Sequence, residues 1–398
     1  MKRNVCILCV LVAASAGCSR ERYGIVARLG NDTISIERIT RTGKRVVSDV
    51  AERSPRAMRK HWEALLNPDG SVRRFILERH LLNPAPSETP VVKSVIDFTA
   101  DSVIMTVDSA GTARRSVVPR TPHVDAPWNP YVYGTYELLF EAASHVTGDS
   151  IRIHQFIPGF GRGHGVVRRR REGGFALVST RLAGTGLATL NERGRLVSYD
   201  GRNTTYQQLV QRVDGQPDID RVALHFAELE KKSPGSWLSM RDTTNATVGA
   251  ATVTIDYGRP RARGRTILGD VVPYNRVWRT GANAATQLTT TAPISIAGIK
   301  LAPGTYTLWT LPTQDSVVLI INKQSGQWGT SYRPEFDLAR ARLTVENTTA
   351  LTEAFTIDVE QTDARSGALV LEWDHFRWTA PIAMSAGAPA KNSPATSR

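Results

Sequence analysis

The stretch SVIMTV, residues 102–107, decides the fold class because its apolar side chains recur at every second position. In an extended chain Val103, Met105 and Val107 fall on one face, and the residues between them fall on the other. This period of two is typical of a half-buried β-strand. The segment therefore predicts a strand with one face in the core.

Similar short segments surround this strand, and turn sequences separate them. Asn67-Pro68-Asp69-Gly70 stands between HWEALL and SVRRFILERH, and Asn191-Glu192-Arg193-Gly194 stands between GLATL and RLVSYDG. Turns rich in Asn, Asp, Pro and Gly between strand-like runs indicate hairpins. We therefore expect an antiparallel meander from Tyr23 to about Val213.

Two helices are expected to interrupt this meander. From about 218 to 230 apolar residues recur at helical spacing on one face, after the start signals Pro217 and Asp218. A second, less periodic helix is expected at 136–143. The charged and Pro/Gly-containing run at 231–235 then has the composition of a domain boundary.

Strand patterns resume after this boundary. Val253, Ile255 and Tyr257 alternate with polar residues, as do the apolar residues of the segments at 355–359 and 369–373. The segment SVVLIIN, 316–322, is apolar on both faces and indicates a central strand. Short strands joined by Gly/Pro turns predict an antiparallel sandwich or barrel rather than a βαβ sheet.

Together these patterns predict a mainly β protein with two antiparallel β domains. The N-terminal domain is expected to be a curved sheet or half-barrel with one or two helices, and the C-terminal domain a β-sandwich. The boundaries we assign are a signal peptide at 1–17, a lipidated linker at 18–22, the two domains at 23–234 and 235–382, and a disordered tail at 383–398 rich in Ala, Ser and Pro.

The first residues follow the pattern of a bacterial export signal. Lys2 and Arg3 precede an apolar run, and small residues stand before Cys18, as in the lipobox of bacterial lipoproteins. Lipidation of Cys18 would anchor the chain to a membrane. Because Ser15 stands where lipoboxes usually carry Leu, cleavage by ordinary signal peptidase after Ala14-Ser15-Ala16 remains the alternative.

The charge of the chain favours acidic partners. The formal net charge is +13, and loss of Lys2 and Arg3 with the signal would lower it by two. At an envelope surface this charge suits an anionic glycan, a lipid or another envelope protein, and does not suit nucleic acid. Ser19 after the anchor favours the periplasmic face of the outer membrane, with a soluble periplasmic or secreted protein as the alternative.

The C-terminal domain resembles the bacterial domain-of-unknown-function family 2911 (DUF2911). The resemblance rests on four segments that occur in the family's order: IDYGRPRARGRTILGDVVPYNRVWRTGANAATQL, GIKLAPGTYTLWTLP, VVLIINKQSGQWG and LVLEWDHFRWTAPI. It implies a compact β-rich domain of exported proteins and supplies no activity. Members usually carry an acidic residue after the Asn of this motif, whereas Asn283 is followed here by Ala284.

The N-terminal domain resembles the strand-rich half-barrels of periplasmic lipoproteins. The resemblance rests on GLATLNERGRLVSYDGRNTTYQQLVQRVDG, residues 186–215, and the helix that follows. It bears on shape alone.

The candidate ligand-binding residues lie in the C-terminal domain. A guanidinium beside aromatic rings suits carboxylate, phosphate or sugar recognition, and the residues that could form such a pocket are Tyr257, Arg259, Trp278, Arg279 and Asn283. The alternative is structural: the aromatic residues belong to the core, and Arg279 and Asn283 hold the loop around Gly281 by bonding backbone carbonyls.

Other signals are weaker. The glycine-rich run 159–165, followed by Arg168 to Arg171, could form an anion-binding nest, or equally a hairpin tip with a solvated basic face. The eight histidines are scattered without metal-ligand spacing, so we expect no metal and no cofactor. No nucleophile motif identifies a catalytic serine.

We therefore expect a non-enzymatic envelope lipoprotein that binds a ligand or a protein partner. An envelope hydrolase with its pocket near Arg279 and Asn283 is the first alternative. A periplasmic lipid carrier, whose curved N-terminal sheet encloses an apolar cavity, is the second.

Overall fold

The computed structural model describes residues 20–232 and 238–385 and is mainly β, with two sheets and two α-helices. The predicted signal peptide, Cys18 and most of the predicted tail lie outside these residues. The described chain divides into two compact units. The larger holds most of residues 20–226, and the smaller holds the chain from Ala227 onward with the short segments Arg28–Ile34 and Arg53–Ala57.

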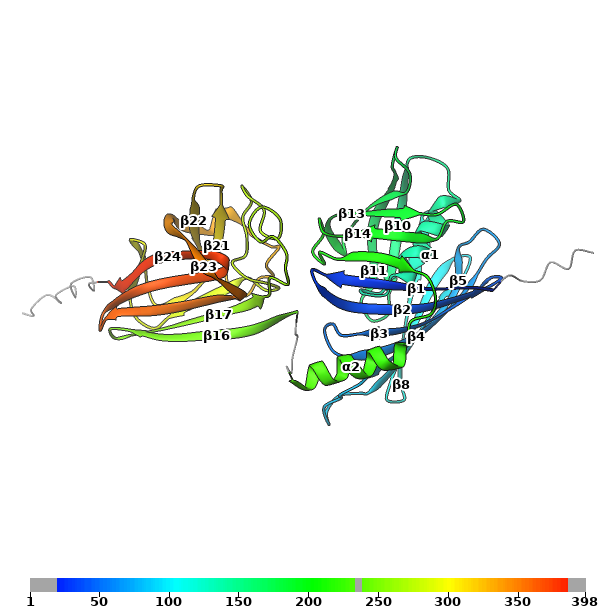
Figure 1. The fold of residues 1–398 in the computed structure, drawn as a ribbon, viewed down its shortest axis with the longest axis horizontal. Helices are drawn as coiled ribbons and strands as arrows, with labels where there is room; N and C mark the ends of the chain where they lie inside the picture. The colour runs from blue at the N-terminus through cyan, green and yellow to red at the C-terminus, as the bar shows by residue number, and fades with distance from the viewer. Residues whose placement is uncertain (1–19, 233–237, 386–398) are drawn as a thin grey trace, which may run out of the picture. The chain divides into compact units, whose positions relative to one another are not determined.

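The N-terminal unit is built on a 15-stranded sheet (Figure 1), with strands in the order β8-β7-β6-β5-β4-β3-β2-β1-β15-β14-β13-β12-β11-β10-β9. The strands are β1 (Arg20–Leu29), β2 (Asp32–Thr42), β3 (Arg45–Glu52), β4 (Met58–Leu66), β5 (Val72–Leu81), β6 (Val91–Phe98), β7 (Ser102–Ser109), β8 (Thr112–Pro119), β9 (Val124–Pro127), β10 (Ser150–Ile157), β11 (Gly161–Arg169), β12 (Phe175–Ser179), β13 (Leu182–Leu190), β14 (Leu196–Asp200) and β15 (Leu209–Val213).

The expected antiparallel meander is confirmed from β2 to β8 and from β10 to β15, whereas β9 pairs with β10 in parallel. SVIMTV lies in β7, where Val103 and Met105 are buried. HWEALL and SVRRFILERH lie in β4 and β5, and Gly70 in the turn between them has a φ of +78°, which favours glycine. β1 begins at Arg20, so residues 20–22, which we assigned to a linker, belong to this strand.

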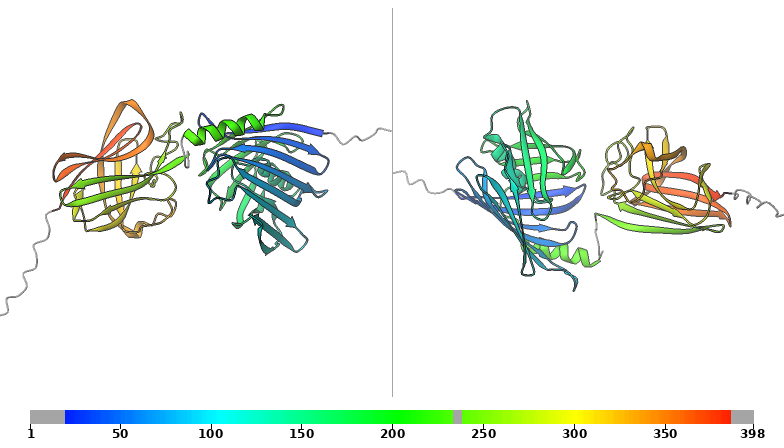
Figure 2. Two further views of the ribbon diagram at one scale, coloured as in Figure 1. Left: turned by 90° about the horizontal axis from the view of Figure 1, so that it is seen from below. Right: turned by 180° about the vertical axis from the view of Figure 1, so that it is seen from behind.

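The sheet is curved, because its two edge strands follow each other in sequence. β8 ends at Pro119 and β9 starts at Val124, at opposite edges of the sheet. A connection of this length spans at most about 18 Å, so the two edges approach each other at this end. The sheet is nevertheless not a closed barrel, which agrees with the predicted half-barrel. Figure 2 shows the curvature from two further sides.

Helix α1 (Gly134–Ser144) joins β9 to β10 and lies inside the curve of the sheet, close to the helix expected at 136–143. The Glu37 carboxylate of β2 accepts hydrogen bonds from the backbone N–H groups of Tyr133 and Gly134 at the helix N-terminus. On α1 itself, Glu137 accepts hydrogen bonds from the Tyr23 hydroxyl and the Leu196 N–H. These carboxylates satisfy donors that would otherwise be buried without a partner.

The side chains of α1 fill the interior of the curved sheet. Tyr136, Leu138, Leu139 and Phe140 are all at most 2% exposed. Burial raises the pKa of Glu37 to about 8 and also raises the pKa of Glu137. An interior packed with a helix and buried carboxylates argues against the lipid carrier, which requires an apolar cavity.

Helix α2 (Ile219–Lys232) follows β15 and matches the helix expected at 218–230. Asp218 begins it, because its carboxylate accepts a hydrogen bond from the Arg221 N–H at 3.1 Å. The apolar face buries Ile219, Ala223 and Phe226. Among the described residues, no helix is long and apolar enough to cross a membrane.

The C-terminal unit contains a nine-stranded sheet in the order β16-β17-β18-β21-β22-β23-β24-β19-β20. Its elements are β16 (Ser239–Val248), β17 (Ala251–Pro260), β18 (Thr286–Thr290), β19 (Ile294–Ile296), β20 (Ile299–Leu301), β21 (Gly304–Pro312), β22 (Val317–Asn322), the 3₁₀ helix η1 (Pro334–Phe336), β23 (Asp337–Asp363) and β24 (Ser366–Met384).

This sheet folds over on itself around one core, as the predicted sandwich requires. Side chains from β17, β22 and β24 share a single buried cluster, which includes Ile255, Leu319 and Trp373. SVVLIIN supplies β22, which has neighbours on both sides, so its expected central position is confirmed. The last strand continues through Met384, two residues into the segment that we expected to be disordered.

The end of this domain contains one departure from the sequence pattern. Simple alternation places the side chains of Asp374 and His375 on opposite faces of a strand. Asp374 instead has a φ of +54°, and the pairing of β23 with β24 is irregular here. His375 Nε2 and Asp374 Oδ1 lie 3.9 Å apart at this irregularity.

Candidate functional site

The aromatic residues predicted for a ligand pocket lie in the C-terminal core. Tyr257 is 1% exposed and Trp278 is 9% exposed. Both rings pack edge-on against Phe355, at centroid distances of 6.0 and 5.1 Å, and Trp278 also stacks on Trp373. These contacts support the structural alternative for the two aromatic residues.

Arg259 is also occupied by structural contacts. Its guanidinium donates to the carbonyl of Phe355 at 3.1 Å, to the Thr356 hydroxyl and to the Asp242 carboxylate. It therefore ties β17 to β16 and β23 and leaves little capacity for a ligand.

For Arg279 and Asn283, the contacts match neither a ligand pocket built with the aromatic residues nor the expected structural role in the Gly281 loop. Within the described residues the Arg279 guanidinium has no hydrogen-bond or ion-pair partner, and its Nε atom is buried. The Asn283 side chain is exposed, and its residue has a φ of +63°. The two side chains do not tie the Gly281 loop by bonding carbonyls as the structural alternative expected.

The glycine-rich run lies at the hairpin between β10 and β11, in agreement with the hairpin tip that we gave as the alternative to an anion-binding nest. Gly159 and Gly161 have positive φ values beside the exposed Phe160. Gly165 is needed for close strand packing, because a Cβ atom there would lie 2.6 Å from the Val178 carbonyl oxygen. The run nevertheless contributes His164 to a cluster that the sequence did not reveal.

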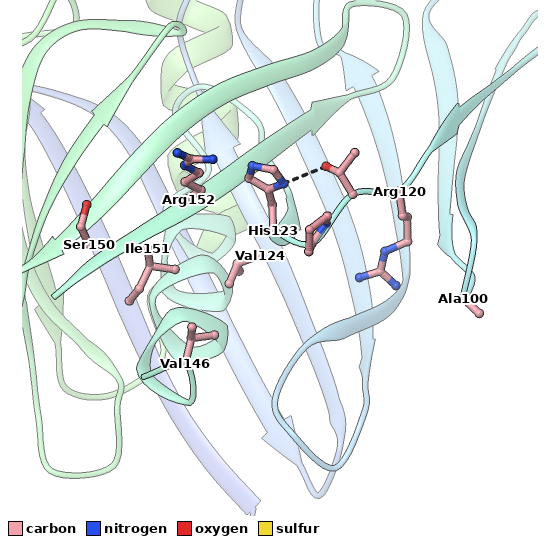
Figure 3. Close-up of a pocket in the computed structure, with 10 residues that line it drawn as sticks. Ala100, Arg120, His123, Val124, Val146, Ser150, Ile151 and Arg152 are labelled. Carbon is pink, nitrogen blue, oxygen red and sulfur yellow. Dashed lines mark hydrogen bonds between the residues drawn. The ribbon is translucent and has the colours of Figure 1, made fainter. Parts of the chain in front are cut away.

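An open cleft of about 680 Å³ lies in the N-terminal unit (Figure 3). Its lining comes from the β6–β7 turn, the connection between β8 and β9, the segment after α1, and β10; the residues are Ala100, Arg120, Thr121, Pro122, His123, Val124, Val146, Ser150, Ile151 and Arg152. The cleft therefore lies where the two edges of the curved sheet approach each other.

The buried carboxylate of Asp125 contacts both Arg120, which lines this cleft, and the buried imidazole of His154. Asp125 of β9 stands opposite His154 of β10, and His154 Nδ1 lies 3.0 Å from Asp125 Oδ1. Arg120 Nε donates to the other carboxylate oxygen at 2.7 Å and also reaches the Thr99 carbonyl. Burial lowers the pKa of His154, against the opposing effect of Asp125.

Two further histidines surround His154. The His123 ring stacks on it at a centroid distance of 4.2 Å, and the His164 ring meets it edge-on at 5.0 Å. His123 Nδ1 lies 2.8 Å from the Thr121 hydroxyl. Within the described residues, no group of three or more His, Cys, Asp or Glu side chains is placed to hold a metal ion.

A second opening of about 370 Å³ adjoins the first and shares His123 and Arg152 with it. Its other lining residues are Ile153, His164, Gly165, Val166, Val178, Ser179 and Thr180. This opening is more apolar than the first. A ligand that spans both openings would meet basic groups at one end and valine side chains at the other.

The lining of these openings is basic and contains no acidic side chain among the described residues. Arg120 is neutralised by Asp125, but Arg152 is exposed and forms no hydrogen bond or salt bridge with any described residue. Figure 3 shows its guanidinium close to the His123 ring. The local charge therefore favours an anion.

The sequence contained little that could have located this cluster. His123, His154 and His164 come from the β8–β9 connection, β10 and β11, and their spacing matches no ligand motif. A clue lies in strand register, because His154 pairs directly with both Asp125 and His164. That register depends on which strands become neighbours, which local patterning does not specify.

The comparisons with known proteins agree with these observations without supplying an activity. Residues 239–382 match the model of DUF2911, a protein family of unknown function, which confirms the resemblance of the C-terminal domain. No curated protein matches this chain.

Two solved structures show a limited likeness to the chain. A DUF1089 family protein from Pseudomonas aeruginosa has 14% identity and a TM-score of 0.31, covering 44% of this chain and 92% of its own. A β-barrel-like protein of domain of unknown function DUF1849 from Brucella abortus has 8% identity and a TM-score of 0.26, covering 49% of this chain and 98% of its own.

Proposed function

We propose that this protein is an exported envelope lipoprotein, anchored through Cys18, whose N-terminal unit binds a small molecule that carries an oxyanion. The observation that carries the binding proposal is Arg152, an unpaired guanidinium in a lining that contains no acidic side chain among the described residues. Support for the anchor comes from the signal-like N-terminus.

The cleft offers complementary contacts for such a ligand. The guanidinium of Arg152 presents several donors in one plane, which suits a carboxylate or phosphate. His123 adds an imidazole at the shared wall, and Val166 and Val178 offer an apolar surface in the adjoining opening. The Asp125–His154 pair holds β9 and β10 in register beneath these groups.

Isothermal titration with inorganic phosphate and with galacturonate tests the binding proposal. We expect Arg152→Gln to weaken binding about 10-fold or more, because a charge-assisted hydrogen bond contributes about 1.5–3 kcal/mol. Arg193→Gln is the matched control, since Arg193 is exposed in the turn at 191–194. Equal phosphate binding by wild type and Arg152→Gln, or no phosphate binding by wild type, would refute the proposal.

The intact mass of the membrane fraction tests the anchor. We expect wild type to be membrane-bound with added acyl mass, and Cys18→Ser to lose both properties. If wild type is unmodified and free of the membrane, the lipoprotein assignment is wrong and a soluble periplasmic or secreted protein replaces it.

A further inference from the structure

Arg279 differs from the arginines inside the N-terminal unit, which meet carboxylates. Arg41 meets Glu137 and Glu141, while Arg195 and Arg212 both meet Glu21. Arg279 is half-buried, its Nε atom is buried without a hydrogen-bond partner, and no hydrogen bond or ion pair joins its guanidinium to a described residue. Burial alone lowers its pKa, with no contribution from a neighbouring charge.

Even a half-buried guanidinium is costly to a folded protein when its inner nitrogen has no hydrogen-bond partner. Removing a charge from water without supplying a partner typically destabilises the fold by several kcal/mol. Such a residue is tolerated when something else compensates for it, and an anionic ligand is the simplest compensation for a cation.

We propose that Arg279 is the oxyanion-binding residue of a second ligand site, in the C-terminal unit and separate from the N-terminal cleft. The ligand class is a carboxylate attached to a sugar or a similar ring. The proposal does not depend on binding at Arg152.

The backbone around Arg279 is held in an unusual conformation. Thr280 and Asn283 have φ values of +50° and +63°, and Gly281 between them has a φ of +154°. Two hydrogen bonds fix this loop, from the Thr286 hydroxyl to the Thr280 carbonyl at 2.6 Å and from the Gly329 N–H to the Asn283 carbonyl at 3.0 Å. Left-handed non-glycine residues are uncommon and cluster at ligand-binding sites.

Gly329 gives the Arg279 side chain its room. A Cβ atom at Gly329 would lie 2.0 Å from Arg279 Cδ and 2.5 Å from the Asn283 carbonyl oxygen. The arginine stem therefore runs directly against the backbone of the segment at 328–329. This close approach fixes the path of the side chain, although its charged end has no partner among the described residues.

The neighbourhood also offers groups suited to a ring. Trp328, which precedes Gly329, is 56% exposed and pairs with Ala284 through an isolated bridge. An exposed tryptophan suits the apolar face of a sugar ring. The exposed amide of Asn283 can donate and accept hydrogen bonds with hydroxyl groups.

Thermal unfolding of the mature full chain tests this proposal, in an Arg152→Gln background so that the N-terminal cleft does not contribute. The probes are galacturonate, galactose as its neutral counterpart, and acetate as the carboxylate without a ring. The variants are Arg279→Met, Arg279→Lys, and Arg365→Met as a control that removes an exposed arginine from the turn between β23 and β24.

We expect galacturonate to raise the Tm of the background protein more than acetate does, and galactose to have no effect. Without a probe, Arg279→Met should raise Tm by about 3 °C, because it removes a half-buried charge that has no partner among the described residues. It should also abolish the galacturonate response. Arg279→Lys should keep the charge but weaken the response, and Arg365→Met should change neither quantity.

Two results would overturn the proposal. One is a galacturonate response that is absent in the Arg152→Gln background or unchanged by Arg279→Met. The other is a lower Tm for Arg279→Met, which would show that the arginine stabilises the fold. Loss of phosphate binding at Arg152 affects neither result, so the two proposals fail independently.

Discussion

At the scale of single residues, the partner decides what an arginine does in this protein. Arg41 is buried and meets two carboxylates, so it stabilises the interior. Arg152 is exposed beside a cleft, and Arg279 is half-buried without a partner in the described chain. The same side chain is therefore structural in the first position and available to a ligand in the other two.

Glu37 should make the stability of the protein depend on pH. Burial raises its pKa from 4.5 to about 8, so between these values the unfolded chain ionises while the folded chain stays protonated. The stability contribution is therefore complete below pH 4.5 and is lost as pH rises through about 8. We expect Glu37→Gln to flatten the fall in unfolding free energy from pH 5 to pH 8 by up to about 1.4 kcal/mol per pH unit.

Chemical denaturation at a series of pH values measures this slope. Glu192→Gln serves as the control, because Glu192 is exposed in the turn between β13 and β14. Identical slopes for wild type and Glu37→Gln would contradict the prediction.

Asp125 should hold the pKa of His154 above the value that burial alone would give. The carboxylate raises this pKa, while burial and the neighbouring His123 lower it. We expect Asp125→Asn to lower the pKa of His154 further, because the amide keeps the shape but removes the charge. NMR titration of the imidazole protons measures the change, and a rise in the pKa would contradict this account of the cluster.

At the scale of elements, the two helices show opposite relations to the sheet. α1 is buried on all sides, whereas α2 buries one face and exposes the other. Leu139 on α1 is 1% exposed and Leu224 on α2 is 69% exposed. The helical period alone identified α2 well, because an amphipathic pattern is strongest when one side faces water.

A matched pair of leucine substitutions tests this difference. We expect Leu139→Ala to cost about 2–5 kcal/mol, since it leaves a cavity inside the sheet. Leu224→Ala should change the unfolding free energy by less than about 0.5 kcal/mol. Urea denaturation monitored by circular dichroism measures both, and comparable losses for the two variants would show that α1 is not a core element.

At the scale of the whole molecule, each unit has a hydrophobic core of its own. The core cluster of the C-terminal unit draws its buried residues from 248–382 alone. The DUF2911 match covers nearly the same stretch, 239–382. A segment that has its own core and also matches a single family model is expected to fold as an independent domain.

We therefore expect a fragment spanning residues 239–385 to fold by itself. It should unfold cooperatively on heating and keep the near-ultraviolet circular dichroism of packed tryptophans such as Trp278 and Trp373. A fragment that lacks a cooperative transition would show that this unit depends on the remainder of the chain.

The sequence by itself determined the fold class and most of the elements. SVIMTV, SVVLIIN and the amphipathic run at 218–230 carry their burial pattern in residue spacing, so each could be assigned locally. The core position of Tyr257, which we gave as the alternative to a ligand-binding role, also follows from the alternation along β17, whereas Trp278 lies outside the strands at an isolated bridge.

Only the tertiary structure decided which side chains meet. His123, His154 and His164 come together because β9, β10 and β11 become neighbours, and α1 lies inside the sheet because Glu37 and Glu137 find buried donors. Whether Arg279 has a partner likewise depends on residues far from it in the chain. Local spacing fixes the face on which a side chain lies, whereas its partners depend on strand order and register, which are set by contacts across the whole fold.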